Sequence, residues 1–156
     1  MQFSSQRKLE HRLKPVFELL RRQDLVQQLV DRSEESSDIA TDLVHRRHHQ
    51  ELSAALARLH PADIAHLVEM LPPEDRNSVW KCMPDSTGGN VLVEVSDSVA
   101  ERLIEDTSAD RLLTMGGYLS AEDLGIIEDL LPEDIRERLV AGLKEGDRSW
   151  LETTVT

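Results

Sequence analysis

From Leu59 onward the sequence repeats every 12 residues. An apolar residue precedes a residue that favours a helix start at Leu59-His60, Leu71-Pro72, Met83-Pro84, Val95-Ser96, Leu119-Ser120 and Leu131-Pro132, and Thr107-Ser108 fills the remaining slot. Eight positions after each of these lead residues comes another apolar one: Leu67, Val79, Val91, Leu103, Met115, Ile127 and Leu139. A 12-residue unit fits one short helix and a tight turn. Since such a unit cannot bury its apolar face alone, we expect the units to stack on one another.

Composition favours an all-α fold. Aromatic residues make up only 3% of the chain, so the core must consist of Leu, Val, Ile, Ala and Met, which suits helix-on-helix packing. The single Cys82 excludes an intramolecular disulfide framework and a multi-cysteine zinc site. No apolar run approaches the roughly 20 residues that span a bilayer, so we expect a chain that is not inserted in the membrane.

Longer helices are expected before the repeats. Pro15 suits the first turn of a helix, the polar run over 32–37 indicates a linker, and Ser37 can cap the next helix. The sequence therefore predicts a helical arm over 1–36, a domain of short helices over 37–147 and a tail over 148–156. The polar stretch over 45–51 predicts a bend or pause in the second helix.

The net charge of −12 is unevenly placed. Residues 1–60 carry 10 Lys/Arg against 9 Asp/Glu, whereas residues 61–156 carry 8 against 21. The acidic part would repel phosphates, which disfavours nucleic-acid binding, and would attract divalent cations or a basic partner. A well-solvated acidic helical surface is the simpler interpretation of the same composition.

Acidic residues recur just after the expected helix starts, at Asp63, Glu74, Asp75, Asp85, Asp97, Asp110, Glu122, Asp123, Glu133 and Asp134. There they favour the positive end of the helix dipole, each by roughly 0.3–1 kcal/mol. The alternative is functional: carboxylates gathered along one edge of a stack can hold Mg²⁺ or Ca²⁺ through water. A site of this kind stays weak until a partner supplies more oxygen ligands.

Other motifs favour structural interpretations. Gly88-Gly89 and Gly116-Gly117 are too short to cradle a phosphate; they predict turns, with a short or irregular helix before Val91 and an early helix end after Met115. His45, His48 and His49 lie at metal-binding spacing, but neighbouring arginines repel cations, so a solvated polar face is favoured over incidental Zn²⁺ or Ni²⁺ binding. No nucleophile motif or phosphate loop is present, and an enzyme is not expected.

One segment carries a family resemblance. Leu59-His60-Pro61-Ala62-Asp63-Ile64-Ala65, followed by Leu71-Pro72-Pro73-Glu74-Asp75-Arg76, resembles the intracellular N-terminal domain of MgtE-type magnesium transporters. Val93-Glu94-Val95-Ser96-Asp97 and Leu130-Leu131-Pro132-Glu133-Asp134 continue the resemblance, which spans roughly 39–156.

The resemblance implies an all-α, right-handed superhelix (α-solenoid) at the cytoplasmic side of the plasma membrane. In the family, this domain precedes a pair of CBS domains, a connecting helix and a transmembrane pore, and the parent transporter is a homodimer. At high cytosolic Mg²⁺, ions bridge acidic residues of this domain and the CBS pair, and the pore closes. The chain would then be a Mg²⁺-sensing, gating domain separated from its pore.

The resemblance also assigns metal ligands. An acidic family residue in the first turn after the Leu-Ser repeat corresponds to Glu122, with Asp123 beside it. The position of a second family carboxylate corresponds to Asn90 here, whose amide is neutral. Either that ion site is lost in this chain, or the nearby Glu94 supplies the negative charge. We therefore expect Mg²⁺ at Glu122, Asp123 and Glu94, held weakly in the absence of the CBS domains.

A different class of function is the alternative to this leading hypothesis. A non-enzymatic scaffold of the flagellar-motor-switch type also stacks short helices and lacks catalytic groups. Such a scaffold would bind a protein partner without a metal. The response of the carboxylates to Mg²⁺ separates the two hypotheses.

Overall fold

A computed structural model describes residues 2–32 and 38–154, with side chains described over 7–29 and 39–143. The described residues form helices and no strands, which confirms the all-α prediction. They divide into two compact units, an N-terminal unit over Met1–Pro84 and a C-terminal unit over Asp85–Thr156. No helix in the described part of the chain is long and apolar enough to cross a bilayer.

The 12-residue register of the sequence is the register of the short helices. Helices α3 to α9 begin twelve residues apart, at Pro61, Pro73, Asp85, Asp97, Ala109, Ala121 and Glu133. The lead residues before them are buried at Leu71, Met83, Val95, Leu119 and Leu131, as are all the residues eight positions later except the half-buried Leu139. Burial of one or both of these positions in every unit confirms the repeat as a packing pattern. The handedness of a superhelix stays a prediction.

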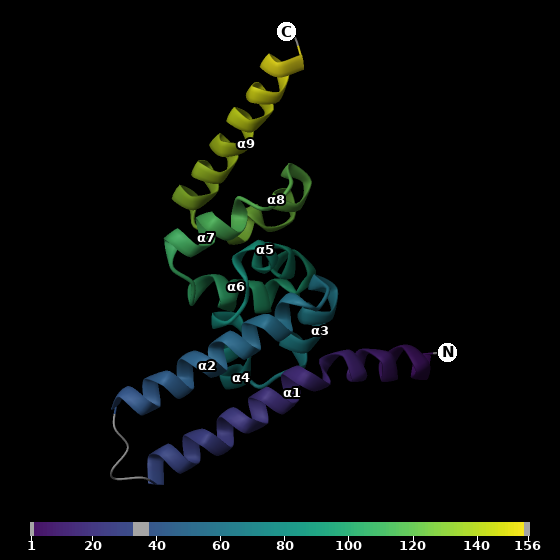
Figure 1. Cartoon of the computed structure of the whole chain (residues 1–156). Coiled ribbons are helices and arrows are strands. Elements are labelled where there is room, and N and C mark those ends of the chain that lie inside the picture. Colours follow the sequence, from purple (N-terminus) through teal and green to yellow (C-terminus); the bar gives the residue numbers. More distant parts are fainter. Residues whose placement is uncertain (1, 33–37, 155–156) are drawn as a thin grey trace. The chain divides into compact units, whose positions relative to one another are not determined.

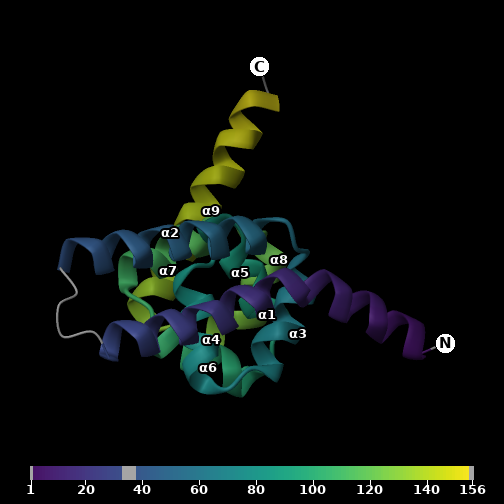
Figure 2. The same ribbon diagram turned by 60° about the horizontal axis from the view of Figure 1, so that its bottom comes forward.

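In the N-terminal unit, two long helices form a hairpin on two short ones. Helix α1 (Gln2–Arg32) packs along α2 (Asp38–Ala57) and also contacts α3 (Pro61–Met70), which in turn contacts α4 (Pro73–Lys81). Figures 1 and 2 show α1 and α2 running side by side in opposite directions. The core between them comprises Leu13, Val16, Leu20, Leu52 and Leu56.

Two predictions for this unit are wrong. Pro15 lies inside α1 rather than at its first turn. A proline lacks the N–H for the hydrogen bond to the preceding turn and bends a helix, and α1 changes direction in its N-terminal half (Figure 1). Burial of Leu13 and Val16 on either side of Pro15 keeps the helix continuous. The pause expected over 45–51 is also absent, since α2 is unbroken from Asp38 to Ala57.

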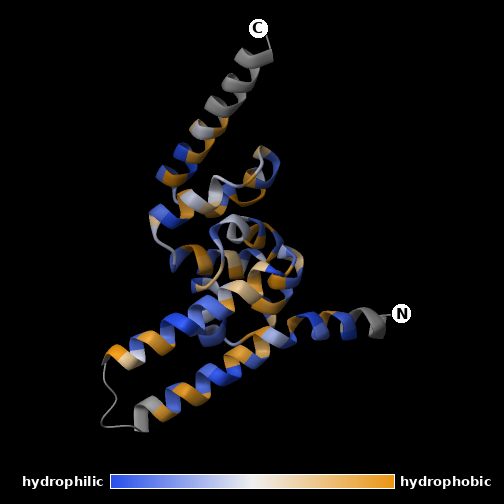
Figure 3. Ribbon diagram, in the orientation of Figure 1, coloured by the Kyte–Doolittle hydropathy of each residue, from blue (hydrophilic) through white to orange (hydrophobic). Residues whose placement is uncertain are grey.

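In the C-terminal unit, short helices pack around α5 (Asp85–Glu94). Helix α5 contacts α6 (Asp97–Glu105), α7 (Ala109–Gly116) and α8 (Ala121–Ile127); the 3-10 helix η1 (Glu128–Leu130) contacts α6 and α8. Helix α9 (Glu133–Thr154) contacts α7, and its C-terminal half extends beyond the other helices of this unit (Figure 1). Apolar and polar residues interleave along the short helices (Figure 3), as the amphipathic pattern requires.

Helix starts are capped as the sequence indicates. The Ser120 hydroxyl accepts a hydrogen bond from the Asp123 N–H at 3.1 Å, and the His60 ring nitrogen Nδ1 accepts one from the Ala62 N–H at 3.2 Å. Cys82 is buried and fills the core as a small apolar residue. Of the linker expected over 32–37, Arg32 is the last residue of α1, and residues 33–37 with the Ser37 cap lie outside the described residues. The expected tail over 148–156 continues α9 through Thr154.

The paired glycines serve helix packing, which corrects the turn prediction. Gly88 and Gly89 are buried within a regular ten-residue α5. A Cβ on Gly89 would lie 2.8 Å from the Met115 carbonyl oxygen and 3.0 Å from Leu119 Cγ, so absence of a side chain lets α5 approach α7. Helix α7 ends at Gly116, close to the predicted stop, and the described glycines show no positive φ.

Gly89→Ala tests this close approach. We expect the free energy of unfolding to fall by about 1–3 kcal/mol, because the new methyl group overpacks against a backbone oxygen that cannot move alone. Gly125→Ala in α8 is the matched control, since its Cβ would meet nothing within 4 Å and the helix gains up to about 1 kcal/mol. Urea unfolding measures both, and equal effects of the two substitutions would contradict the packing role.

Candidate functional site: acidic helix starts and a basic cavity

Most of the negative charge belongs to the C-terminal unit. Residues 85–156 carry 17 Asp/Glu against 6 Lys/Arg, a net of −11, whereas residues 1–84 carry 13 against 12. One ion pair joins described side chains of this unit, between Arg111 Nε and the Asp85 carboxylate at 3.3 Å. Because so few positive groups balance them, these carboxylates repel one another and attract cations.

Each sequence-predicted metal ligand lies at a helix end. Glu122 and Asp123 lie in the first turn of α8, where Glu122 is exposed and Asp123 half-buried. Glu94 is exposed at the last position of α5, the helix against which α8 packs, and Asn90 is half-buried one turn before it. Across the described residues, no three or more His, Cys, Asp or Glu side chains gather as a ready metal site. The predicted ligands thus provide oxygen atoms for a shared ion but do not enclose one.

Two other first-turn carboxylates are used by the fold itself. Asp63 accepts hydrogen bonds from Arg12 Nε and Nη2 at 2.9 and 3.1 Å, which joins α3 to α1. This ion pair raises the pKa of the Arg12 guanidinium. Asp85 is held by Arg111 in the same way. First-turn position alone therefore does not distinguish a ligand from a structural carboxylate.

A second acidic feature was missed by sequence reasoning. A groove of about 730 Å³ in the C-terminal unit has a floor of Ile104, Leu112, Leu131 and Ile135. Its exposed rim carries four carboxylates and no basic residue: Glu101, Glu105, Asp129 and Asp134. The signal in the sequence was the spacing of four between Glu101 and Glu105, which places both on one face of α6.

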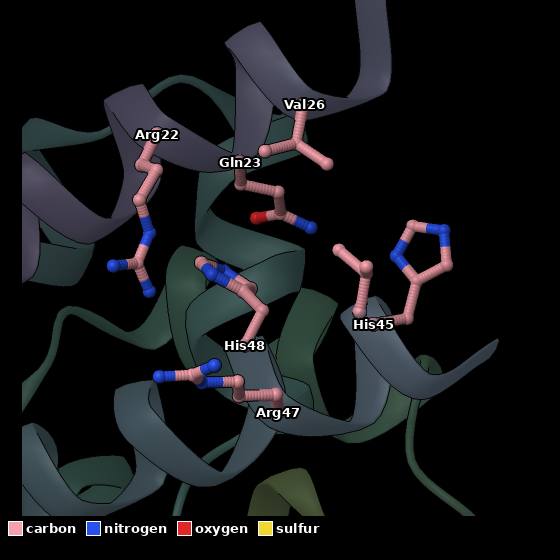
Figure 4. A pocket seen from close by; sticks show the side chains of 7 residues that line it. Arg22, Gln23, Val26, His45, Arg47 and His48 are labelled. Carbon is pink, nitrogen blue, oxygen red and sulfur yellow. The ribbon is translucent and has the colours of Figure 1, made fainter. Parts of the chain in front are cut away.

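The hairpin of the N-terminal unit carries a partly open cavity that is lined by positive rather than negative side chains. It measures about 310 Å³, lies between α1 and α2, and is lined by Arg22, Gln23, Val26, Val44, His45, Arg47 and His48 (Figure 4). His48 is buried, with 9% of its surface exposed, which corrects the prediction of a solvated histidine face at this position. Its neighbour His49 lies with Nε2 3.3 Å from the Lys81 carbonyl oxygen, and His66 is exposed on α3 as expected.

Burial lowers the pKa of His48, and the charges of Arg22, His45 and His49 lower it further. Its Nε2 atom has no hydrogen-bond partner among the described residues. A buried imidazole beside two arginines favours the neutral form, because a third positive charge would be both desolvated and repelled. His48 is therefore neutral in the folded protein at neutral pH.

These observations define a class of protein: an all-helical domain of short repeats that carries an acidic surface and no catalytic constellation in its described part. The family described as the MgtE intracellular N domain matches residues 59–155, more than half of the chain. The chain belongs to this family, and the matched region is an intracellular domain of a magnesium transporter, a class without enzymatic activity. Comparisons with curated proteins and with solved structures gave no significant match.

The pH dependence of stability tests the state of His48. Its folded pKa lies below the unfolded value of about 6.5, so as the pH falls the unfolded chain takes up a proton first. We expect the free energy of unfolding of the N-terminal hairpin to fall between pH 7.5 and 5.5, by at most about 1.4 kcal/mol per pH unit. Urea unfolding monitored by NMR signals of α1 and α2 measures it.

His48→Leu should flatten this dependence without loss of stability at pH 7.5, because an unsatisfied buried nitrogen is removed. His66→Leu, at an exposed position of the same unit, is the control and should retain the wild-type slope. The account fails if both variants show the slope of the unmodified chain.

Proposed function

We propose that the chain is the cytosolic Mg²⁺-sensing, gating domain of its parent magnesium transporter. The observation that carries this proposal is the family match over 59–155, which covers every short helix from α3 to α9. The charge of −11 over residues 85–156 supports it, because a sensor of divalent cations needs carboxylates whose repulsion a cation relieves.

The proposed mechanism is relief of like-charge repulsion. Glu122, Asp123 and Glu94 present exposed or half-exposed oxygen atoms, the ligands that Mg²⁺ prefers. Mg²⁺ keeps several of its waters, so two or three carboxylates from one surface hold it weakly. A facing acidic surface completes the coordination, and the two surfaces stay together only while ions lie between them.

The facing surface is proposed to be the CBS domain pair of the same parent protein. Mg²⁺ bound between them would hold the pore closed at high cytosolic concentration, and its loss would release this domain. The parent is proposed to be a homodimer in the plasma membrane, with this domain on the cytoplasmic side. A coding sequence that continues past Thr156 into CBS and membrane segments is expected, and a stop codon there would contradict the proposal.

Titration of Mg²⁺ into the chain, followed by backbone amide NMR, tests the proposed ligands. We expect saturable shifts centred on Glu122 and Asp123, with a smaller response at Glu94, and a dissociation constant on the order of millimolar because the partner's ligands are absent. Glu122→Gln with Asp123→Asn should weaken this binding about tenfold. K⁺ at equal ionic strength should leave these amides unshifted.

The matched control is Asp97→Asn with Asp110→Asn. It removes two exposed carboxylates from the first turns of α6 and α7, so net charge and helix-dipole effects are the same as in the test variant. This control should retain wild-type Mg²⁺ affinity. Shifts centred on the groove carboxylates Glu101, Glu105, Asp129 and Asp134, or equal loss in both variants, would contradict the assignment. No response at any carboxylate would favour the metal-independent scaffold.

A further inference from the structure

The cavity between α1 and α2 combines positive charge, a polar group and apolar walls. Arg22 and Arg47 contribute two positive charges, and no carboxylate is among its lining residues. The Gln23 amide lies between these groups and Val26 (Figure 4), and Val44 completes the apolar part of the wall. The lining residues carry a net charge of +2 when both histidines are neutral, and the ion pairs of both arginines with Glu51 outside the cavity leave a local net charge of +1. The cavity is chemically complementary to a small anion with an apolar portion.

Both guanidinium groups are oriented by one carboxylate outside the cavity. Glu51 accepts hydrogen bonds from Arg22 Nη2 and from Arg47 Nε, the latter at 3.2 Å. Glu51 does not line the cavity, and these bonds engage one nitrogen of each guanidinium. A guanidinium has five N–H donors in a fixed plane, so each arginine retains donor capacity while its side chain is held in place.

The third observation is the unsatisfied nitrogen of His48. Its side chain is more than nine-tenths buried, lines the cavity, and leaves Nε2 without a partner among the described residues. Buried polar atoms in native proteins nearly always have a hydrogen-bond partner, and one that lacks it indicates a ligand or water at that place. An oxygen atom bound there would accept a hydrogen bond from Nε2–H.

We infer that this cavity binds a small organic carboxylate. The carboxylate oxygens accept hydrogen bonds from His48 Nε2–H and from the guanidinium groups of Arg22 and Arg47. A short hydrocarbon portion contacts Val26 and Val44. A volume of about 310 Å³ lies at the lower end of the range for small-molecule sites and is sufficient for a small organic carboxylate.

This site is independent of the proposed function. Its residues lie between 22 and 48, outside the matched region over 59–155, and none of them is a proposed Mg²⁺ ligand. The cavity joins the two helices that precede the short repeats. Binding there stabilises the hairpin by favouring the packed arrangement of α1 on α2.

Butyrate is the probe for the test, titrated into the whole chain against chloride at equal ionic strength. We expect saturable NMR shifts confined to the His48 ring, the Gln23 side-chain amide and the methyl groups of Val26 and Val44. The dissociation constant is expected on the order of a few millimolar for so small a ligand. Binding should tighten from pH 7.5 to pH 6, because a bound carboxylate stabilises the imidazolium form of His48.

His48→Leu should weaken butyrate binding about tenfold or more and abolish the pH effect, whereas His66→Leu should change neither. Arg47→Gln gives an independent variant that leaves the buried histidine in place. Its control is Arg46→Gln, because both arginines are exposed but only Arg47 lines the cavity. Shifts spread over exposed arginines, shifts reproduced by chloride, or affinity retained in both test variants would overturn the site. Tighter binding of inorganic phosphate than of butyrate would overturn its assignment to a carboxylate.

Discussion

The structure depends on burial of apolar residues at one or both of two positions in every 12-residue unit. Helices of seven to ten residues are unstable in isolation, since nucleation is costly and few hydrogen bonds repay it. Each unit is stabilised instead by a lead residue and by the residue eight positions later, such as Leu119 and Ile127. A fully buried side chain of this size contributes about 1.5–3 kcal/mol. The spacing of these two positions sets the length of each short helix, where it begins and which of its faces packs against its neighbours.

The same register determines where the charges lie. A lead residue comes directly before each short helix, so the polar residues that follow it fall in the first turn of that helix, where carboxylates favour the helix dipole. The fold uses Asp63 and Asp85 in ion pairs with Arg12 and Arg111. Glu122, in contrast, is exposed at its helix start. Because the C-terminal unit has few basic side chains, its carboxylates stay available to a cation.

The sequence predicts local features of the fold well, because they depend on local patterns. Seven helix starts, the Ser120 and His60 caps and the buried repeat positions follow from periodicity and capping preferences. The errors concern packing between distant residues. The sequence of Gly88 and Gly89 predicts a turn. Only the close approach of Met115 and Leu119 shows that these glycines serve helix packing. Pro15 and the polar segment around His48 remain helical because the hairpin buries their neighbours, a contact between residues some 40 positions apart.

The candidate sites also differ in whether the sequence alone could reveal them. Glu122, Asp123 and Glu94 were predicted from a resemblance, and their exposed or half-buried positions at helix ends fit a shared ion. The groove formed by α6, α7, η1 and α9 could be found only from the fold. The cavity at His48 was also hidden, because neither burial nor the missing partner of Nε2 can be derived from spacing. The sequence had predicted a solvated polar face at these histidines in preference to a metal site, whereas the burial of His48 beside arginines favours an anion.

Mg²⁺ flux through the parent transporter tests the central claim most directly. The transporter, reconstituted in liposomes with this domain facing outward, would be compared with a form that carries Glu122→Gln and Asp123→Asn. The account predicts that external Mg²⁺ in the millimolar range closes the unmodified transporter and that the substituted one stays open at concentrations several-fold higher. Identical Mg²⁺ dependence of closure in the two forms would contradict it.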